Sequence, residues 1–491
     1  MKKTFLRWIA CLLVLLTVAA LAACTDPNKG PVGSTPTGEQ TDGDETADPF
    51  DALPDRDLKG YAFNVLIRNE DYMVKDMFQE TVSQDNVESA IYNRNLKVEE
   101  AFKVDLVPIA KAEGFTAMDS IFAGDAEYDL ILPHARYAAM YAGGGYLLDW
   151  HSLPVVDLTA EWWDQNCNES LSIHNRLFYT TGDISYWSYG ATNQLLFNKN
   201  LFTEIGLEYP YQDVKDNDWT IDDFEVLVKK GSKDLDGDGK FDYATDQFGY
   251  MTIGFVGDVQ AYHATGNTVI SKDIDDTPYI SYLTDRAEDV WEWYSTLIED
   301  DSVYFQDRLV SYFDTNAVKG FQSGRSLFID INTINVAAMR EMEDEFGIIP
   351  WPTYAEGETY LTNVDAGMHL FCLPITTPDA ERTGLVLEAL AILGHQTVIP
   401  EYMETTVKYK QTRDDESFEM LDIIFDGRVY DLGYYNVELT GAVGKDEAIA
   451  NNFKHLTEND VASMAVAWAK YQTSAEQYLE DYLIKLEQAV S

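Results

Sequence analysis

Two strand-like apolar runs with a helical pattern between them constrain the fold of this chain most. The run YAFNVLIR, Tyr61 to Arg68, alternates and then stays apolar as a buried strand does, and YDLILP, Tyr128 to Pro133, repeats this pattern. Between the two runs, apolar residues recur at helical spacing over 86–102. The order strand, helix, strand predicts a parallel sheet and therefore an α/β fold.

Polar residues follow both predicted strands at the points where the strands end. Arg68, Asn69, His134 and Arg136 occupy these positions. In open parallel sheets, ligands bind beyond the carboxyl ends of the strands, so these four residues are candidates for a ligand cleft. The alternative is that they are ordinary solvated loop residues.

The N-terminus has the features of an export signal. Three basic residues precede an apolar run from Trp8 to Ala23, and the run ends in LAAC, Leu21 to Cys24. Such a run is short for a membrane span, and small residues before a cysteine resemble the lipobox of bacterial lipoproteins. We therefore predict a signal peptide over 1–23 and lipidation at Cys24, with an uncleaved anchor as the alternative. Both interpretations place the chain on the outer face of the bacterial cell membrane.

Composition separates a tether from the folded part of the chain. Residues 25–50 are rich in Thr, Gly, Pro and Asp, which predicts a flexible, lipid-anchored tether over 24–57. The following residues are too many for one core, so we expect two lobes.

The net charge of −49 argues against nucleic acid as a partner, because phosphate binding needs a basic surface. Beyond the tether, Cys167 and Cys372 either pair or stay free.

The segment DLDGDGKFD, residues 234–242, matches the first nine positions of a calcium loop. The candidate ligands are carboxylates and one backbone carbonyl, from Asp234, Asp236, Asp238, Lys240 (carbonyl), Asp242 and Asp246. Position 12, normally a bidentate glutamate, is Thr245, and Asp246 comes one residue late. The loop therefore lacks the ligand that opens a sensor, which favours a structural calcium ion over a switch. A solvated Asp-Gly turn is the alternative.

A helix with clear start and stop signals precedes this loop. In DWTIDDFEVLVKKG, Thr220 is the expected N-cap, Trp219 and Phe224 are spaced as a hydrophobic staple, and Gly231 ends the helix. Further strands are expected at 326–331 and 368–375. In TPDAERTGLVLEALAILG we expect a helix capped by Thr377 and stopped by Gly394.

The order of these features resembles the extracellular solute-binding lipoproteins of ABC importers, of the maltose and oligosaccharide-binding type. The resemblance rests on the lipobox and on YDLILPHARYAAMYAGGGYLLDW, NQLLFNKNLFTEIGLEYP, DWTIDDFEVLVKKGSKDLDGDGKFD, FQSGRSLF with FGIIPWP, and LPITTPDAERTGLVLEALAIL. It implies a periplasmic-binding-protein-like fold, in which two α/β lobes close on a ligand by hinge motion. The implied lobes are 58–180 with 328–376, and 181–327 with 377–491.

The same resemblance implies a carbohydrate ligand, ABC permease subunits as partners and a monomeric chain. Sugars stack on aromatic rings while carboxylates, amides and arginines take the hydroxyls. The segment DISYWSYG lies at the expected first crossing between the lobes, so Asp183, Tyr186, Trp187 and Tyr189 are ligand candidates, with packing in the hinge core as the alternative.

Other positions refine the expected ligand. Asn332 and Asn335 lie where maltose-type proteins place tryptophans, which argues against maltodextrin itself. Arg68 and Arg136 also suit an acidic sugar.

Two other functions are considered. A glycoside hydrolase would need a pair of carboxylates with separated pKa values, and the sequence shows no catalytic motif that marks an enzyme. A surface sensing or adhesion module would use the same fold without a transporter. We therefore expect a binding protein rather than an enzyme.

Overall fold

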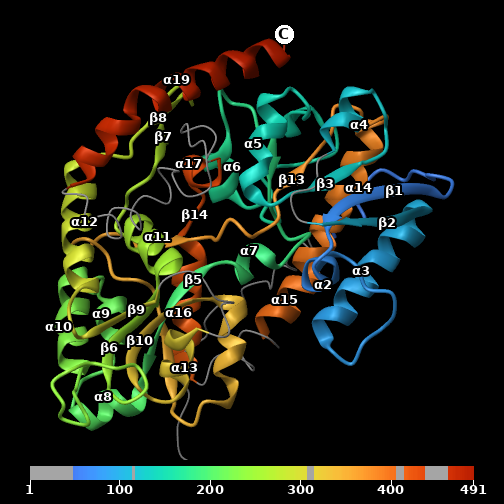
Figure 1. The fold of residues 1–491 in the computed structure, drawn as a ribbon. Coiled ribbons are helices and arrows are strands. Elements are labelled where there is room, and N and C mark those ends of the chain that lie inside the picture. The colour runs from blue at the N-terminus through green and yellow to red at the C-terminus, as the bar shows by residue number, and fades with distance from the viewer. Residues whose placement is uncertain (1–47, 113–116, 307–314, 405–413, 437–462, 491) are drawn as a thin grey trace, which may run out of the picture. The chain divides into compact units, whose positions relative to one another are not determined.

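Two five-stranded sheets form the frame of the structure, a computed structural model that describes residues 48–112, 117–306, 315–404, 414–436 and 463–490 (Figure 1). The predicted signal peptide, Cys24 and most of the predicted tether lie outside the described residues. The tether was predicted to run to residue 57, but residues from 48 onward are folded. The folded part begins earlier than predicted because Phe50 is apolar and packs into the protein. Its side chain is buried, with its ring 6.0 Å from that of Phe102.

The first sheet has the order β2-β1-β3-β13-β4. Its strands are β1 (Tyr61–Arg68), β2 (Val104–Lys111), β3 (Leu130–Leu132), β4 (Tyr179–Thr180) and β13 (Phe371–Cys372). Strand β1 runs parallel to both β2 and β3, as the sequence predicted. Strand β13 is antiparallel to β3 and β4, and it is shorter than the strand predicted over 368–375.

Helices cover both faces of the first sheet. One face packs against α3 (Asn86–Phe102) and α14 (Ala380–Leu393), which share a buried cluster with the strands. The other face packs against α5 (Ala135–Gly143) and α6 (Gln165–Leu171). Helix α3 covers the range predicted from its apolar spacing, and Asp85 caps it by accepting two backbone N–H groups.

The second sheet has the order β11-β5-β10-β6-β9. Its strands are β5 (Asn193–Asn198), β6 (Phe248–Ile253), β9 (Val303–Gln306), β10 (Ser326–Asn332) and β11 (Phe346–Ile349). Strand β5 is antiparallel to β10 and β11, whereas β10, β6 and β9 are mutually parallel.

Two layers of helices enclose the second sheet. One layer is α8 (Lys199–Ile205), α10 (Ile221–Gly231), α11 (Gly254–Ala264) and α12 (Asp285–Ile298). The other is α13 (Asn316–Gln322) and α16 (Asp415–Asp426). Helix α10 confirms its predicted signals: Thr220 and Asp223 form a capping box, and the Trp219 and Phe224 rings lie 6.2 Å apart. Short helices α4 (Met118–Phe122), η2 (Trp150–Ser152) and α9 (Tyr211–Lys215) complete the connections.

The assignment of strands to the two sheets differs from the predicted lobe boundaries. The prediction gave 328–376 to the first lobe, but β10 and β11 pair with β5 in the second sheet. It gave 377–491 to the second lobe, but α14 packs on the first sheet. The reason is that sequence order does not reveal strand partners: β10 returns beside β5 before the chain crosses to the first sheet at β13.

Helix α14 also starts and ends differently from the prediction. Asp379, not Thr377, caps it, because the Asp379 carboxylate accepts the Arg382 N–H at 2.9 Å. Gly394 does not stop the helix: its φ is −60°, and the chain continues as a π-helix, η5 (Gly394–Val398), and as α15 (Ile399–Glu401). A Cβ at Gly394 would lie 1.9 Å from the carbonyl oxygen of Asp183, so glycine is needed for this close approach.

The continuous helical stretch Ala380–Glu404 is long and apolar enough to cross a membrane, and it is the one such stretch among the described residues. Of the apolar 18-residue part that meets this test, 78% is buried inside the protein, as in the core helix of a folded domain.

Two segments connect the sheets and contact each other. The first, 181–192, runs from β4 to β5 and contains α7 (Trp187–Gly190); the second, 364–370, leads to β13. The Asp365 N–H donates to the Ala191 carbonyl at 2.9 Å, and Thr192 forms a bridge with Val364. Figure 1 shows α7 between the two sheets. The first crossing therefore falls at the predicted DISYWSYG segment.

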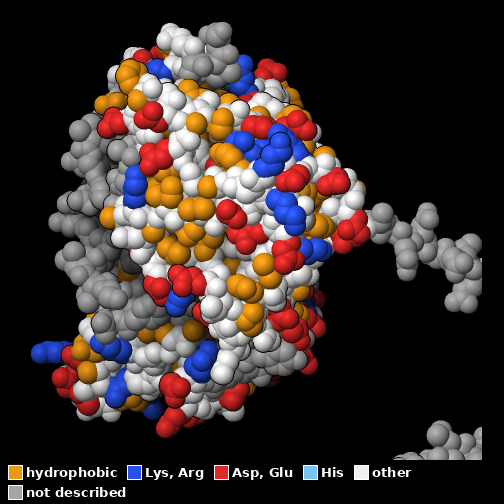
Figure 2. All heavy atoms as spheres, turned by 90° about the vertical axis from the view of Figure 1, so that its right-hand side faces the viewer, with side chains coloured by type: hydrophobic (Ala, Val, Ile, Leu, Met, Phe, Trp, Pro, Cys, Tyr) orange, Lys and Arg blue, Asp and Glu red, His pale blue; other side chains and the backbone are white. Residues whose placement is uncertain are grey.

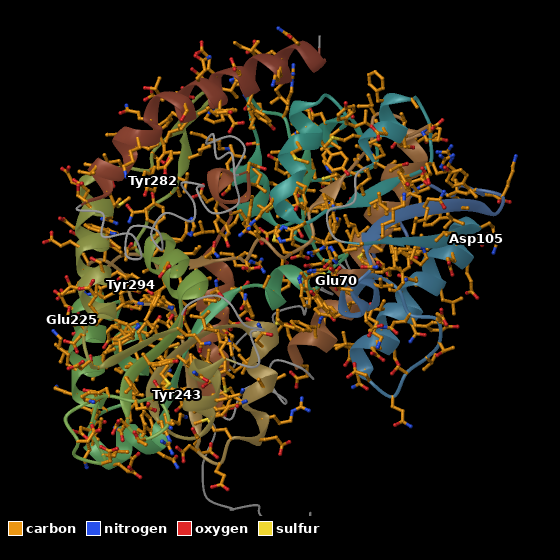
Figure 3. All side chains as sticks on the ribbon, in the orientation of Figure 1. Glu70, Asp105, Glu225, Tyr243, Tyr282 and Tyr294 are labelled. Atoms are coloured by element: carbon orange, nitrogen blue, oxygen red, sulfur yellow. The ribbon has the colours of Figure 1, made fainter. Side chains whose placement is uncertain are left out.

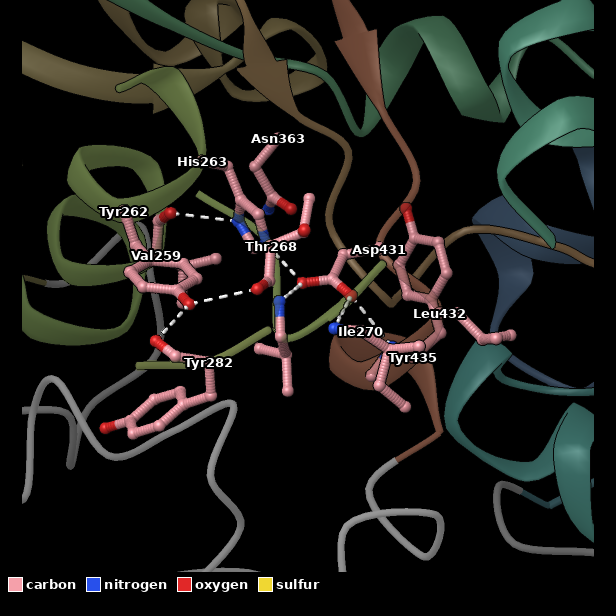
Figure 4. A network of polar contacts seen from close by, with 12 residues as sticks. Val259, Tyr262, His263, Thr268, Ile270, Tyr282, Asn363, Asp431, Leu432 and Tyr435 are labelled. Atoms are coloured by element: carbon pink, nitrogen blue, oxygen red, sulfur yellow. Dashed lines mark hydrogen bonds and ion pairs between the residues drawn. The ribbon is translucent and has the colours of Figure 1, made fainter. Parts of the chain in front are cut away.

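A buried polar network joins the hairpin β7 (Ile270–Lys272) and β8 (Pro278–Ile280) to the C-terminal part of the chain (Figure 4). Asp431, just before α17 (Leu432–Tyr435), accepts the backbone N–H groups of Val269, Ile270 and Gly433. His263 from α11 lies with its Nε2 3.0 Å from Asp431 and its Nδ1 3.0 Å from the Val259 carbonyl. This network fixes α11 against α17.

The remaining elements lie around this network. Strands β12 (Thr362–Asn363) and β14 (Arg428–Val429) pair in parallel beside α11. The C-terminal helix α19 (Met464–Val490) contacts α12 of the second sheet and α5 of the first (Figure 1). It therefore contacts helices that cover both sheets.

Candidate functional site

A cavity of about 500 Å³ lies where the first sheet, the second sheet and both crossing segments meet. Its lining combines aromatic, amide and charged side chains: Arg68, Glu70, Tyr72, Met73, His134, Tyr186, Trp187, Ala191, Asn332, Ile334, Asn335, Asp365 and Gly367. Six of the ten sequence-predicted ligand residues are in this set: Arg68, His134, Tyr186, Trp187, Asn332 and Asn335. Its volume is typical of small-molecule sites.

Strand ends position the lining residues, as the parallel sheet predicted. Arg68 is the last residue of β1, and the chain turns there into α2 (Asp71–Met77), which brings Glu70 and Tyr72 to the cavity. His134 follows β3 and caps α5. Asn332 ends β10, and Asn335 lies in the following helix η4 (Thr333–Glu341). Both sheets thus present the carboxyl ends of parallel strands to the same cavity.

A pair of stacked rings forms the aromatic part of the lining. Trp187 stacks on Tyr72 with ring centroids 5.1 Å apart and an interplanar angle of 26°. Tyr72 is 50% exposed, whereas Trp187 is only 8% exposed. The ring that faces solvent is therefore Tyr72, and Trp187 supports it from behind. Tyr186 is held in turn by Tyr402, with centroids 4.5 Å apart.

Two carboxylates line the cavity from different segments. Glu70 belongs to the turn after β1, and Figure 3 shows it near α2 and α7. Its Oε2 is buried and has no hydrogen-bond partner among the described residues. Asp365 comes from the second crossing segment, where its Oδ1 accepts the Gly367 N–H at 2.7 Å. Both can accept hydrogen bonds from ligand hydroxyl or amino groups.

The predicted arginines do not face the cavity together. The Arg68 guanidinium is 4% exposed and donates to the Gly367 carbonyl and toward the Met73 sulfur, so it forms the floor of the cavity. Arg136 is not part of the lining, and its charge lowers the pKa of the buried Tyr434, which burial raises. The pair of arginines that suggested an acidic sugar is therefore not assembled.

A buried layer beneath the cavity holds the lining in place. The Asp76 carboxylate accepts the Ser185 hydroxyl and the Tyr186 N–H, which ties α2 to the first crossing segment. Burial raises the pKa of Asp76 to about 7, opposed by hydrogen bonds and by the Arg94 charge. Burial, with the nearby Arg68 charge, holds the pKa of His369 well below its usual value. His369 is therefore neutral near pH 7.

Asp183 and Tyr189 belong to a second buried network rather than to the cavity. The Asp183 carboxylate contacts His395 Nδ1 at 2.7 Å and accepts the Tyr189 hydroxyl at 3.3 Å. Arg428 lies 4.2 Å from the Tyr189 ring centroid and forms an ion pair with Asp164. As ligand residues these two predictions are not supported, because both side chains are engaged with each other and with His395 or Arg428.

Asn69 also falls outside the lining. Its side chain is exposed, and its N–H continues the β1 ladder by donating to the Lys111 carbonyl at 2.9 Å. Asn69 is therefore a strand-end residue.

Seven lining residues were not predicted from the sequence, and three of them have a charged or aromatic side chain: Glu70, Tyr72 and Asp365. Glu70 and Tyr72 directly follow the predicted end of β1, so extending the strand-end argument by four residues would have found them. Asp365 gives no such signal, because the second crossing could not be located before the strand pairing was known.

The aspartate loop joins α10 to β6, as predicted. Carboxylate oxygens of Asp234, Asp236 and Asp246 lie within 4.8 Å of one another, a spacing compatible with the oxygen shell of Ca²⁺. Asp238 and Asp242 are not in this group. Asp246 accepts the N–H groups of Leu235 and Asp242 at 2.8 and 2.9 Å, and backbone hydrogen bonds lower its pKa. Calcium binding stays a prediction.

Cys167 and Cys372 are both buried and free in the structure. Burial raises the pKa of each thiol. Of the alternatives left open by the sequence, the structure has the unpaired thiols.

Solved structures with this fold were found by comparison. The cyclo/maltodextrin-binding protein complexed with maltotetraose has a TM-score of 0.54 at 13% identity, covering 88% of this chain and 98% of that one. M. tuberculosis UspC has a TM-score of 0.57 at 15% identity, covering 85% and 100%. The GacH receptor of Streptomyces glaucescens, solved unliganded and with acarbose, has a TM-score of 0.53 at 12% identity, covering 86% and 99%.

No protein-family model matches the sequence, and a search of curated proteins finds no similar sequence. The structural similarity establishes the class: this chain has the two-lobed, periplasmic-binding-protein-like fold. This is the fold class that the sequence features predicted.

Proposed function

We propose that this protein is the substrate-binding component of an ABC importer and captures a carbohydrate, of oligosaccharide type, between its two lobes. The observation that carries the proposal is the composition of the cavity. An exposed ring, two carboxylates and two amides come together from both sheets and both crossing segments. These are the groups that bind a sugar, since rings take its apolar faces and polar groups take its hydroxyls.

The position of the cavity also suits capture by closure. The lobe built on the first sheet and the lobe built on the second both contribute side chains. The crossing segments 181–192 and 364–370 connect the two lobes. A ligand that contacts both lobes binds the closed arrangement better than an open one, so it shifts the population toward closure. We propose these two segments as the hinge.

The remaining parts of the proposal rest on the sequence. Lipidation at Cys24 would hold the protein on the outer face of the cell membrane, beside the permease subunits that accept the sugar. The protein would act as a monomer. A calcium ion in the aspartate loop would have a structural role, because the loop lies between α10 and β6 and contributes no residue to the cavity.

Binding without catalysis is the preferred function. The similar solved structures are binding proteins. Release of chromophore from nitrophenyl glycosides by the purified protein would instead indicate a hydrolase. A sensing or adhesion module of this fold would bind the same sugar but would not support its uptake in cells that depend on it.

A thermal-shift panel of mono- and oligosaccharides tests the proposal directly. A sugar present at about 100 times its dissociation constant should raise the free energy of unfolding by about 2.7 kcal/mol. Calorimetry then gives the affinity of each sugar found. If no member of a broad panel stabilises the protein, the carbohydrate proposal is wrong.

A further inference from the structure

The accessible charge of the cavity lining is negative. Glu70 and Asp365 supply two carboxylates. Of the basic side chains in the lining, Arg68 is nearly fully buried and directs its guanidinium to the Gly367 carbonyl. The Nδ1 of His134 accepts the Arg136 N–H at 3.3 Å, so this nitrogen caps helix α5. The Arg68 guanidinium is thus engaged with the protein, and the two carboxylates are the charged groups that can contact a ligand.

Glu70 is a lining residue whose carboxylate lacks a hydrogen-bond donor among the described residues. Its Oε2 is buried and accepts no hydrogen bond from the described residues. Leaving a buried carboxylate oxygen without a donor is costly, so such an oxygen at the wall of a cavity indicates that a ligand completes its coordination. A hydroxyl group offers one donor, whereas a protonated amine offers three donors and a positive charge.

The aromatic part of the lining also favours a positively charged group. Tyr72 is half exposed and presents its ring to solvent at the cavity, stacked on Trp187. The face of an aromatic ring carries partial negative charge and attracts a cation within about 6 Å of its centroid. Glu70 and Tyr72 line the same cavity, so an amino group bound by Glu70 would occupy the cavity that this ring borders.

We infer that the carbohydrate bound in this cavity carries a protonated amino group, and that Glu70 is the main residue that binds this group. The inference rests on the proposed carbohydrate function and specifies the class of sugar. Asp365, from the second crossing segment, adds a second carboxylate to the same lining. Binding of the amine would thus involve both the first lobe and the hinge.

Matched sugars that differ only at carbon 2 test this inference. Cellobiose, the glucosamine disaccharide of the same linkage and its N-acetylated form carry a hydroxyl, an amine and a neutral amide, respectively. Glucose with glucosamine and galactose with galactosamine extend the series. Affinities are measured by calorimetry on the mature wild-type chain at about pH 6, where amines are protonated. The amino form of at least one set should bind about tenfold or more tighter than its neutral counterparts.

Variants of the chain identify the residue that causes the preference for the amino sugar. Glu70→Gln keeps the shape of the side chain and should remove most of the preference for the amino sugar. Asp365→Asn should reduce it as well, and serves as the second variant if Glu70→Gln does not fold. Glu80→Gln makes the same charge change at an exposed position outside the lining, and it should keep the preference.

The outcomes separate this inference from the proposed function. Tighter binding of neutral sugars, or an amino preference that persists in Glu70→Gln, overturns the inference and leaves the carbohydrate function standing. Binding of spermidine without binding of any sugar supports the cationic site but contradicts the carbohydrate function. If none of these probes binds, both are wrong.

Discussion

Tyr72 covers one face of Trp187, with ring centroids 5.1 Å apart and an interplanar angle of 26°. This stack joins the first helix after β1 to the first crossing segment at the edge of the cavity. It also assigns different roles to two rings: the exposed tyrosine meets the ligand, and the buried tryptophan holds the tyrosine in place.

Truncating the exposed ring should weaken binding with little loss of stability. We expect Tyr72→Ala to cost about 1–3 kcal/mol of binding free energy, or about 5- to 150-fold in affinity, measured by calorimetry on the first sugar found. Tyr279→Ala is the matched control, because Tyr279 is also 50% exposed but lies on β8, outside the cavity. Equal effects of the two variants would contradict a role for Tyr72 in binding.

Trp187→Ala should behave differently, because its side chain is 8% exposed and packs in the core. Removing a buried tryptophan costs about 3–5 kcal/mol of stability, so the melting temperature should fall clearly as well as the affinity. A variant that keeps its melting temperature would show that Trp187 lines an open cleft instead.

Removing calcium should lower the melting temperature without abolishing sugar binding. Asp236→Ala should reproduce the effect of a chelator, because Asp236 belongs to the group of converging carboxylates. Asp105→Ala is the control: it removes a charge from an exposed position on β2, outside the loop. Loss of affinity with an unchanged melting temperature would place calcium in the ligand site.

Stability should fall as the pH rises from about 5 to 8. Burial raises the pKa of Asp330 from its usual 3.8 to about 7, only partly offset by the Thr252 and Tyr250 hydroxyls. Between these values the folded state keeps a proton that the unfolded state has lost, so the free energy of unfolding decreases with pH and levels off above about 7. Asp330→Asn should reduce this decrease by about 2 kcal/mol.

The measurement is thermal or denaturant unfolding at several pH values. Asp76 and Glu388, whose pKa values burial also raises to about 7, contribute in the same direction, so some decrease should remain in Asp330→Asn. Asp105→Asn, at an exposed position on β2, should leave the profile unchanged. A wild-type profile that is flat from pH 5 to 8 would contradict this assignment.

Gly394→Ala should destabilise the protein strongly. The new Cβ would lie 1.9 Å from the Asp183 carbonyl oxygen, so the π-helix or the first crossing segment must move, at a cost of about 1–3 kcal/mol or more. Gly190→Ala is the control in α7, because its Cβ would find its nearest neighbour, the Tyr402 hydroxyl, at an ordinary 3.4 Å. Similar melting temperatures for both variants would show that the approach at Gly394 relaxes easily.

Cys24→Ala should release the protein from the membrane fraction of expressing cells, because lipid is the anchor that the sequence offers. Fractionation followed by detection of the protein checks this. Retention of the variant in the membrane would favour an uncleaved apolar anchor.

One face of the molecule carries charges of both signs. On the face drawn in Figure 2, acidic side chains are spread among basic and apolar ones. An extended basic surface, which phosphate binding requires, is not seen on this face.

The sequence by itself determined much of the local structure of this protein. Period-2 and helical spacing located β1, β3 and α3, and the cap residues of α10 were read correctly, because these features depend on residues close together in the chain. The fold class followed from the order of elements. Strand ends predicted Arg68 and His134 in the cavity, because parallel strands present their carboxyl ends on one side.

Only the tertiary structure decided which side chains face the ligand. Asp183 and Trp187 lie four residues apart in one segment, yet one contacts His395 in the hinge core and the other supports Tyr72 at the cavity. Asp365 joins Glu70 only because β10 and β11 pair with β5 before the chain returns to the first sheet. The direction of a side chain depends on what packs against its backbone, and those contacts are formed by residues hundreds of positions away in the sequence.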